Sequence, residues 1–227
     1  MILITGASKG IGKFLLENYL HKGDELVMGT YLNSAPQNFE SCYTKLDVKD
    51  YRQVEGFVEA AKPDLKEITL INCAGITYNA FAHKSDPAKW REVVETNLFG
   101  TFNMLRALLP IMREQKFGRI INFSSVVAVK PTPGVSSYAS SKSALWGLAR
   151  SLAVENAALN ITVNNINMGY STLGMIQEVP ENYLKGIIEQ IPAGKLCDGD
   201  DILNTVQYLR TTGYVTGTSI ELSGGLV

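Results

Sequence analysis

The chain has 227 residues, 45% of them hydrophobic, and a formal net charge of -1 at pH 7. This length and composition suit one folded domain with a substantial core, and they do not indicate a disordered chain. The near-zero charge argues against nucleic acid or an anionic membrane as a partner, and no segment approaches the ~20 apolar residues that cross a bilayer.

Short β-branched runs alternate along the chain with longer helical patterns, which is typical of a parallel sheet with crossover helices. In chain order, the expected strands are Ile2–Thr5, Glu25–Thr30, Tyr43–Leu46, Ile68–Asn72, Arg119–Phe123, Thr162–Ile166 and Ser219–Leu222. The expected helices are Ile11–Lys22, Tyr51–Lys62, Pro87–Glu114, Ser137–Ala157 and Gly199–Leu209. Right-handed crossovers then predict a single α/β domain over residues 1–227, a Rossmann-type, doubly wound parallel sheet of about seven strands with helices on both faces.

The least regular segment, residues 169–195, contains two prolines and a short helical pattern around Tyr183–Ile191. It follows a strand on the side of the sheet where ligands bind in such folds. Loops of this length are uncommon unless they have a function. We therefore expect the segment to cover a substrate, the alternative being an ordinary surface connection.

The histidine and cysteine content bears on metal binding and on the cellular compartment. Two histidines and three scattered cysteines, Cys42, Cys73 and Cys197, match no zinc spacing and no disulfide framework, so we expect no metal site. Unpaired thiols fit a reducing cytosol. The apolar residues 1–4 lead straight into a glycine-rich motif and leave no room for a signal peptide, so we expect a cytoplasmic protein.

Three glycines, Gly6, Gly10 and Gly12, lie between the first expected strand and the first expected helix. Glycines at this place permit a tight turn and let backbone N–H groups approach a pyrophosphate, and the helix dipole favours that anion. Their spacing is Gly-x3-Gly-x-Gly and not the Gly-x-Gly-x2-Gly of the general fingerprint. The position after an apolar strand nevertheless predicts a dinucleotide site.

A second motif combines Tyr138 and Lys142, four residues apart on one face of an expected helix, with Ser125 thirteen residues before the tyrosine. A free phenol has a pKa near ~10 and is a poor acid–base catalyst at neutral pH, whereas an adjacent cation lowers that pKa. Lys142 can supply the cation, and the Ser125 hydroxyl can donate a hydrogen bond to a substrate oxygen. Each residue alone is more often structural, but their spacing together with Asn97 predicts a proton-transfer site.

These motifs, in their order and spacing, resemble the classical short-chain dehydrogenase/reductase family over essentially the whole chain. The resemblance implies a nicotinamide cofactor and a catalytic tetrad of Asn97, Ser125, Tyr138 and Lys142. It implies that Tyr138 is the acid/base and that Lys142 lowers the pKa of Tyr138 and binds the nicotinamide ribose. It also implies that Ser125 orients the substrate and that Asn97 helps to hold a water molecule in a proton relay. It also implies that the cofactor contacts Gly6, Ser8, Lys9, Gly10, Ile11, Gly12, Asn33, Asp47, Val48, Asn72, Ala74, Gly75, Tyr138, Lys142, Gly169 and Thr172. The family usually has Pro-Gly after the sixth strand, whereas this chain has Met168-Gly169.

The choice between NAD and NADP depends on the region after the second strand. An NAD enzyme needs a carboxylate there to bind the ribose hydroxyls, and residues 29–34 contain none. Lys9 can instead pair with a 2′-phosphate, and in the family a basic residue at its place goes with NADP. Leu32, however, stands where many NADP enzymes carry arginine. We expect NADP(H) to be favoured over NAD(H).

Within the family, the chain most resembles 3-oxoacyl-[acyl-carrier-protein] reductases, through residues 120–125, 190–195 and 214–217. This implies an NADPH-dependent reduction of a 3-oxoacyl thioester or similar ketone, a small-molecule carbonyl substrate carried on acyl carrier protein or coenzyme A. Those reductases hold the carrier protein with two basic residues; here Lys116 stands at the first position and Leu159 at the second. The first alternative is a dehydrogenase that oxidises a secondary alcohol with the same tetrad, and the second is a non-catalytic dinucleotide sensor. A nucleotide-sugar epimerase agrees less well, because its glycine spacing differs.

Two long expected helices, Pro87–Glu114 and Ser137–Ala157, carry more apolar surface than one face of a sheet covers. The residues concerned are Leu98, Phe99, Phe102, Leu105, Leu145, Trp146, Leu148 and Leu152. Large apolar surfaces usually mark interfaces, and in the family the corresponding helices pack across a two-fold axis. We expect a homotetramer, with a dimer as second choice and burial in the monomer core as the alternative.

Overall fold

The computed structural model describes residues 1–23, 25–36, 38–174, 176 and 181–227. Its strands form one sheet of parallel neighbours in the order β3-β2-β1-β4-β5-β6-β7. They are β1 (Ile2–Thr5), β2 (Val27–Tyr31), β3 (Tyr43–Lys45), β4 (Thr69–Asn72), β5 (Gly118–Ser125), β6 (Ile161–Met168) and β7 (Ser219–Leu222). The strand order reverses between β1 and β4, so the expected doubly wound, Rossmann-type fold is confirmed.

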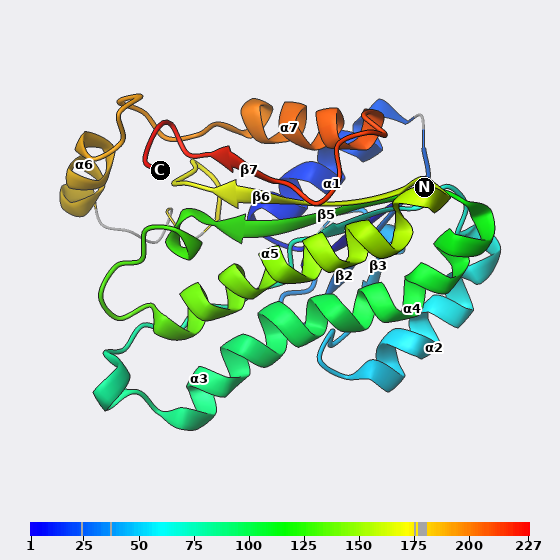
Figure 1. Cartoon of the computed structure of the whole chain (residues 1–227), viewed down its shortest axis with the longest axis horizontal. Helices are drawn as coiled ribbons and strands as arrows, with labels where there is room; N and C mark the ends of the chain where they lie inside the picture. Colours follow the sequence, from blue (N-terminus) through cyan, green and yellow to red (C-terminus); the bar gives the residue numbers. More distant parts are fainter. Residues whose placement is uncertain (24, 37, 175, 177–180) are drawn as a thin grey trace.

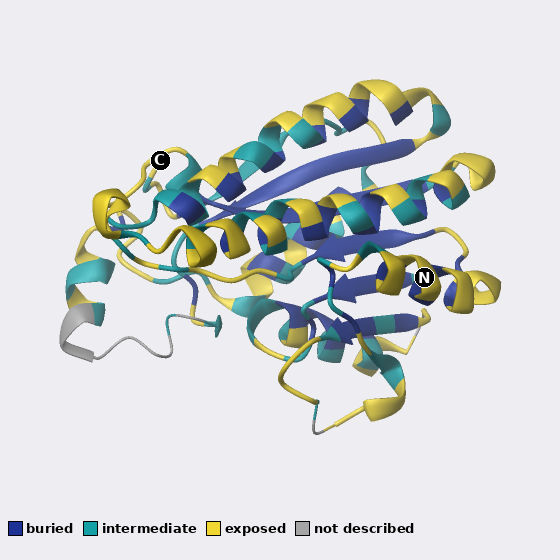
Figure 2. Cartoon of the chain, turned by 90° about the horizontal axis from the view of Figure 1, so that it is seen from below, coloured by how far each residue is buried: buried dark blue, intermediate teal, exposed yellow. Residues whose placement is uncertain are grey.

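Helices cover both faces of the sheet (Figure 1). The α-helices are α1 (Gly10–Lys22), α2 (Tyr51–Ala61), α3 (Pro87–Val94), α4 (Gly100–Gln115), α5 (Ser136–Asn156), α6 (Glu181–Glu189) and α7 (Gly199–Thr211). Apolar residues of α1 and α7 pack on one face in one core cluster, and those of α2, α4 and α5 pack on the other face in a second cluster. Each crossover helix thus buries its apolar side against the strands, as Figure 2 shows by burial.

The helix expected over Pro87–Glu114 is interrupted. Between α3 and α4 the backbone forms a π-helical turn at Glu95–Phe99, and Asn97 lies within it. A single π turn inserted in an α-helix occurs often at functional sites. Helical periodicity does not reveal such a turn, because it shifts the register by only one residue.

Strands β5 and β6 are longer than expected, since they pair continuously from Gly118 with Ile161 to Ser125 with Met168. A row of buried polar side chains crosses the sheet within these strands. Asn72 Nδ2 donates to Asn122 Oδ1 at 2.9 Å, and Asn122 Nδ2 donates to Asn165 Oδ1 at 3.1 Å. These bonds join the carboxyl-terminal parts of β4, β5 and β6, where Ser125 ends its strand.

No helix in the described part of the chain is long and apolar enough to cross a membrane. Within those same residues, no group of three or more His, Cys, Asp or Glu side chains is arranged to hold a metal ion. The three cysteines are free thiols.

Candidate active site

The turn between β1 and α1 has the geometry of an anion-binding loop. Gly6 has φ of +63°, and a Cβ atom there would lie 2.7 Å from Ala74 Cα. At Gly12 a Cβ would lie 2.5 Å from the carbonyl oxygen of Gly6, so both positions require glycine. The N-cap residue Lys9 makes no side-chain cap, and the first turn of α1 has no acidic residue. The N–H groups at this helix end therefore suit a phosphate group.

Two further segments meet this loop. Ala74 N donates to Thr5 Oγ1 at 3.2 Å, which holds the end of β4 against the end of β1. After β6, the chain returns so that a Cβ on Gly10 would lie 3.2 Å from Gly174 Cα. The first part of the segment 169–195 thus reaches the glycine-rich loop, while residues 175 and 177–180 of that segment lie outside the described residues.

Tyr138 and Lys142 lie one turn apart on α5, and the Lys142 ammonium is 5.5 Å from the centroid of the Tyr138 ring. Lys142 is buried, and its Nζ donates to the carbonyl oxygen of Phe123 at 2.7 Å. Ser125, the last residue of β5, shares a hydrogen bond with Tyr138. The structure therefore brings the serine, tyrosine and lysine of the expected site together at the carboxyl end of β5.

Burial governs the charges in this cluster. It raises the pKa of Tyr138 above the usual value for a phenol, and the hydrogen bond with Ser125 opposes that rise. It lowers the pKa of Lys142 to about 8. Tyr138 is therefore a neutral phenol at pH 7, while Lys142 is charged but close to titration.

The Asn97 side chain is fully buried and makes hydrogen bonds through both ends of its amide. Ile76 N donates to its Oδ1 at 2.8 Å, and its Nδ2 donates to Ile76 O at 2.9 Å and to Ser141 Oγ at 3.0 Å. A Cβ on Gly75 would lie 3.2 Å from Asn97 Oδ1 and 3.6 Å from Lys142 Nζ, so Asn97 borders the same space as Lys142. Its amide is occupied by protein groups, which makes it a link between the loop after β4 and helix α5.

The other residues expected to contact the cofactor occupy the same edge of the sheet. Asp47 follows β3 and accepts from Lys49 N at 3.0 Å, and Val48 is buried beneath Gly100 of α4. Ile11 packs on the α1 side of the core. Asn33 is exposed in the connection after β2.

The segment after β6, which departs from the family pattern in sequence, is fixed by two backbone hydrogen bonds. Gly169 N donates to Leu222 O at 2.9 Å, and a Cβ on Gly169 would lie 2.9 Å from Ser223 Cα. Thr172 N donates to Cys197 O at 2.9 Å. Gly169 and Thr172 are thus held beside β7 and the segment before α7.

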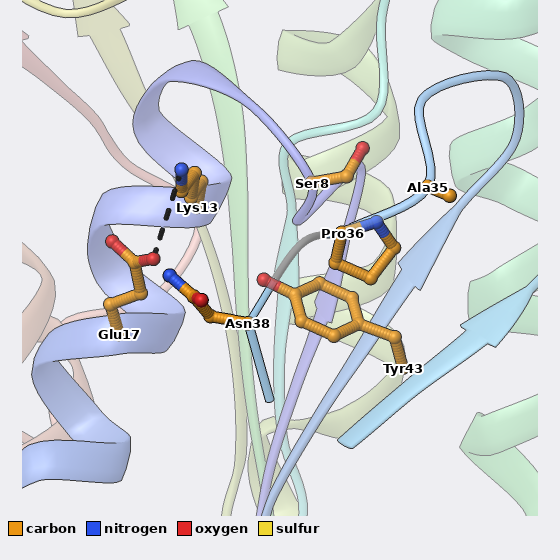
Figure 3. A pocket seen from close by; sticks show the side chains of 7 residues that line it. All are labelled: Ser8, Lys13, Glu17, Ala35, Pro36, Asn38 and Tyr43. Atoms are coloured by element: carbon orange, nitrogen blue, oxygen red, sulfur yellow. Dashed lines mark ion pairs between the residues drawn. The ribbon is translucent and has the colours of Figure 1, made fainter. Parts of the chain in front are cut away.

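Two features of the site were not expected from the sequence. Cys73 follows β4 and interacts electrostatically with Lys142, and burial raises the pKa of its thiol to about 12, so it is neutral. A pocket beside the glycine-rich loop is lined by Ser8, Lys13, Glu17, Ala35, Pro36, Asn38 and Tyr43 (Figure 3). The one feature of the sequence that could have pointed to Lys13 is its position one helical turn after Lys9.

The fold and this cluster are those of an NAD(P)-dependent oxidoreductase. Comparisons with known proteins show to which family of these enzymes the chain belongs. A family model described as short chain dehydrogenase matches residues 1–184. The chain is 34% identical over 234 residues to the 3-oxoacyl-[acyl-carrier-protein] reductase FabG of Haemophilus influenzae, covering 99% of this chain and 96% of that protein. It is 37% identical over 232 residues to an acetoacetyl-CoA reductase of Rhizobium meliloti, covering 98% of this chain and 96% of that protein.

A solved structure agrees with these sequence relatives. The crystal structure of a 3-oxoacyl-[acyl-carrier protein] reductase from Brucella melitensis superimposes with a TM-score of 0.90 at 29% identity, covering 99% of this chain and 90% of that one. The chain belongs to the short-chain dehydrogenase/reductase family. It is an NAD(P)-dependent oxidoreductase related to 3-oxoacyl-[acyl-carrier-protein] and acetoacetyl-CoA reductases.

Proposed function

We propose that the protein is an NADPH-dependent carbonyl reductase that converts a 3-oxoacyl thioester, or a similar ketone, into a secondary alcohol. The observation that carries the proposal is the cluster of Ser125, Tyr138 and Lys142 at the carboxyl end of β5, on the same edge of the parallel sheet as the uncapped start of α1. Relatives named as reductases of acyl-carrier-protein and coenzyme A substrates, at 30–37% identity, support the thioester.

In this reaction Tyr138 donates its phenolic proton to the carbonyl oxygen of the substrate. Its raised pKa supports the reductive direction, because the group is protonated at neutral pH and ready to act as an acid. The Lys142 ammonium stabilises the phenolate that forms, and the Ser125 hydroxyl donates to the oxygen as negative charge develops on it. Asn97 holds the loop after β4 against α5, which positions Lys142 for a proton relay. When bound, the reduced nicotinamide supplies the hydride.

The proposed cofactor site extends from the glycine-rich loop to the end of β6. Lys142 and Tyr138 bind the nicotinamide ribose, and Gly169 and Thr172 lie toward the nicotinamide amide. The loop of Gly6, Gly10 and Gly12 with Ser8 and Ile11 binds the pyrophosphate, while Asn72, Ala74 and Gly75 line its floor, and Asn33, Asp47 and Val48 contact the adenosine. Lys9 and the absence of a carboxylate in residues 29–34 support NADPH over NADH.

We propose that the substrate binds beneath residues 169–195. Residues 1–227 form a single domain in this proposal. Lys116, exposed at the end of α4, is one basic residue that can contact an acidic carrier protein. Leu159, at the second such position, packs against the core and offers no charge. Because only one of the two basic residues is present, a coenzyme A thioester is a candidate substrate as well as a thioester of acyl carrier protein. We propose that the enzyme is cytoplasmic.

The test is a spectrophotometric assay of NADPH oxidation by purified protein with acetoacetyl-CoA, acetoacetyl-acyl carrier protein, simple ketones and quinones. We expect turnover with at least one acetoacetyl thioester and a preference for NADPH over NADH. Lys9→Ala should weaken NADPH binding selectively. Activity only on simple ketones or quinones, or tighter binding of NADH, would contradict the proposal.

A further inference from the structure

A row of polar side chains crosses the sheet beneath α5. Ser124 of β5 lies opposite Asn167 of β6, and Asn167 lies opposite Glu221 of β7. Ser124 and Asn167 are buried, whereas Glu221, on the strand at the edge of the sheet, is exposed. Buried polar groups need hydrogen-bond partners, and this row finds them in α5 and among its own members.

The row forms one chain of hydrogen bonds that ends on the backbone of Lys142. Asn167 Nδ2 donates to Glu221 Oε1 at 2.5 Å. Trp146 Nε1 donates to Asn167 Oδ1 at 3.0 Å and to Ser124 Oγ at 3.3 Å. Ser124 Oγ in turn donates to Lys142 O at 3.0 Å. A carboxylate at the edge of the sheet is thus joined to the helix turn that carries the lysine of the candidate active site.

The carboxylate decides which way the Asn167 amide points. An ionised carboxylate only accepts hydrogen bonds and an indole N–H only donates, whereas an amide has one end of each kind. Glu221 therefore requires the NH2 end of Asn167, which leaves Oδ1 for the indole of Trp146. A hydrogen bond to a charged acceptor is stronger than one between neutral groups, so this orientation is favoured over the reverse one.

Strand β5 holds Lys142 at both ends. The backbone oxygen of Lys142 accepts from Ser124, and its Nζ donates to the carbonyl oxygen of the adjacent Phe123. Trp146, one turn later on α5, ties the same part of the helix to β5 and β6. Reversal of the Asn167 amide would replace one acceptor of the indole with a donor, and this part of α5 would then shift.

We infer that Glu221 is a positioning residue for the reaction, and that it acts through Asn167 and Trp146 on the part of α5 that carries Tyr138 and Lys142. The inference rests on the proposed function. Because the carboxylate acts on the helix and not on the substrate, it should affect the rate of the chemical step more than substrate binding. Small displacements of catalytic groups lower that rate strongly, because the reacting atoms must be aligned.

Three substitutions of Glu221 separate the ability to accept from the ability to donate. Glu221→Gln keeps an oxygen acceptor for Asn167 and should retain most of the turnover. Glu221→Leu removes the acceptor and should lower kcat by about three- to tenfold, while the KM for substrate changes by less than about twofold. Glu221→Lys offers only donors, which draws Oδ1 of Asn167 away from Trp146, and should lower kcat further. Steady-state kinetics on the acetoacetyl thioester that the protein reduces measure these changes.

The indole of Trp146 reports the amide orientation without turnover. The chain has two tryptophans, so an NMR spectrum of protein labelled at the tryptophan nitrogen contains two indole N–H signals, and Trp146→Phe assigns them. The Trp146 signal should move upfield in Glu221→Leu and Glu221→Lys as its hydrogen bond weakens, and it should stay in place in Glu221→Gln. The double variant Glu221→Leu/Trp146→Phe should lose no more turnover than Trp146→Phe alone, because the two residues act in one chain.

Glu55→Leu supplies the matched control, because it removes the same charge at an exposed position of α2. It should change neither the kinetics nor the Trp146 signal. Light scattering should give the same mass for all variants. A loss of turnover that follows a change of mass would assign the effect to assembly and would overturn the inference.

The outcomes separate this inference from the proposed function. An unmoved Trp146 signal in Glu221→Leu, equal losses of turnover in Glu221→Gln and Glu221→Leu, or additive losses in the double variant would overturn it. A natural protein without turnover on any acetoacetyl thioester overturns the proposed function. In that case a shifted Trp146 signal would still support the link from Glu221 to α5.

Discussion

At the residue scale, the proton donor has the most direct test. Tyr138→Phe keeps the ring that packs near Lys142 but removes the proton that the reaction needs. We predict that turnover falls by about 10²- to 10⁴-fold, the usual contribution of a general acid, while NADPH binding is retained. Steady-state kinetics on the substrate that the NADPH-oxidation assay identifies, together with fluorescence titration, measure the two effects. Retention of most of the turnover would assign the acid to another group.

The charge of Lys142 gives a pH dependence. Burial lowers its pKa to about 8, so the cofactor-free protein holds a charged ammonium below that pH and a neutral amine above it. Since the charged form is the one proposed to bind the nicotinamide ribose, NADPH affinity should decline as pH rises through about 8. NADPH titrations at a series of pH values below and above the pKa of about 8 measure this decline. Lys142→Met should bind weakly at every pH, and a persisting inflection in this variant would assign the titration to another group.

At the scale of elements, the π-helical turn depends on contacts with α5. Ser141 Oγ accepts from Asn97 Nδ2 at 3.0 Å and donates to Tyr138 O at 2.8 Å, so it joins the turn to the helix that carries Tyr138 and Lys142. Ser141→Ala removes both hydrogen bonds and should lower the free energy of unfolding by about 1–3 kcal/mol, at about 0.5–1.5 kcal/mol for each bond. It should also reduce turnover more than it changes the KM for substrate.

The neighbouring Ser140 provides a matched control for that variant, because it is exposed on the same helix. Ser140→Ala should change neither the unfolding free energy nor the turnover. Urea unfolding and steady-state kinetics on both variants make the comparison. Equal effects of the two substitutions would show that the bond to Asn97 has no special role.

At the scale of the whole molecule, the apolar surface of α4 and α5 concerns assembly. Leu105, Leu145 and Leu152 are buried within the monomer, so for them the alternative of core packing holds. Phe99 and Phe102 remain 55% and 44% exposed on the outer side of the π turn and α4. The surplus apolar surface is therefore smaller than the sequence suggested, and among the residues predicted to form it, Phe99 and Phe102 are the large exposed ones.

We propose that this surface forms a two-fold interface and that the protein assembles into a homotetramer. Light scattering after gel filtration should give a mass of about four times the 24.8 kDa of the chain. Phe102→Glu places a charge on the exposed aromatic position and should shift the mass toward smaller species. The mass of a monomer for the natural protein would contradict the prediction. The mass of a dimer would support only the two-fold interface and would contradict the tetramer.

The sequence alone determined the order of strands and helices, because hydrophobic periodicity and the right-handed crossover rule act locally along the chain. It also predicted which residues form the candidate site, since Gly6, Ser125, Tyr138 and Lys142 occur in motifs whose spacing suits the chemistry. Strand limits were less well predicted. Ser124 and Ser125 extend β5, and Asn167 and Met168 extend β6, because these residues pair with each other across the sheet.

Only the tertiary structure decided how the site residues meet. The π turn at Asn97, the contact of its amide with Ser141 and Ile76, and the lowered pKa of Lys142 all arise from packing between segments far apart in the chain. The pocket at Lys13 likewise depends on where the connection after β2 folds back over α1. Burial and long-range hydrogen bonds are properties of the assembled layers, so no local pattern of residues specifies them.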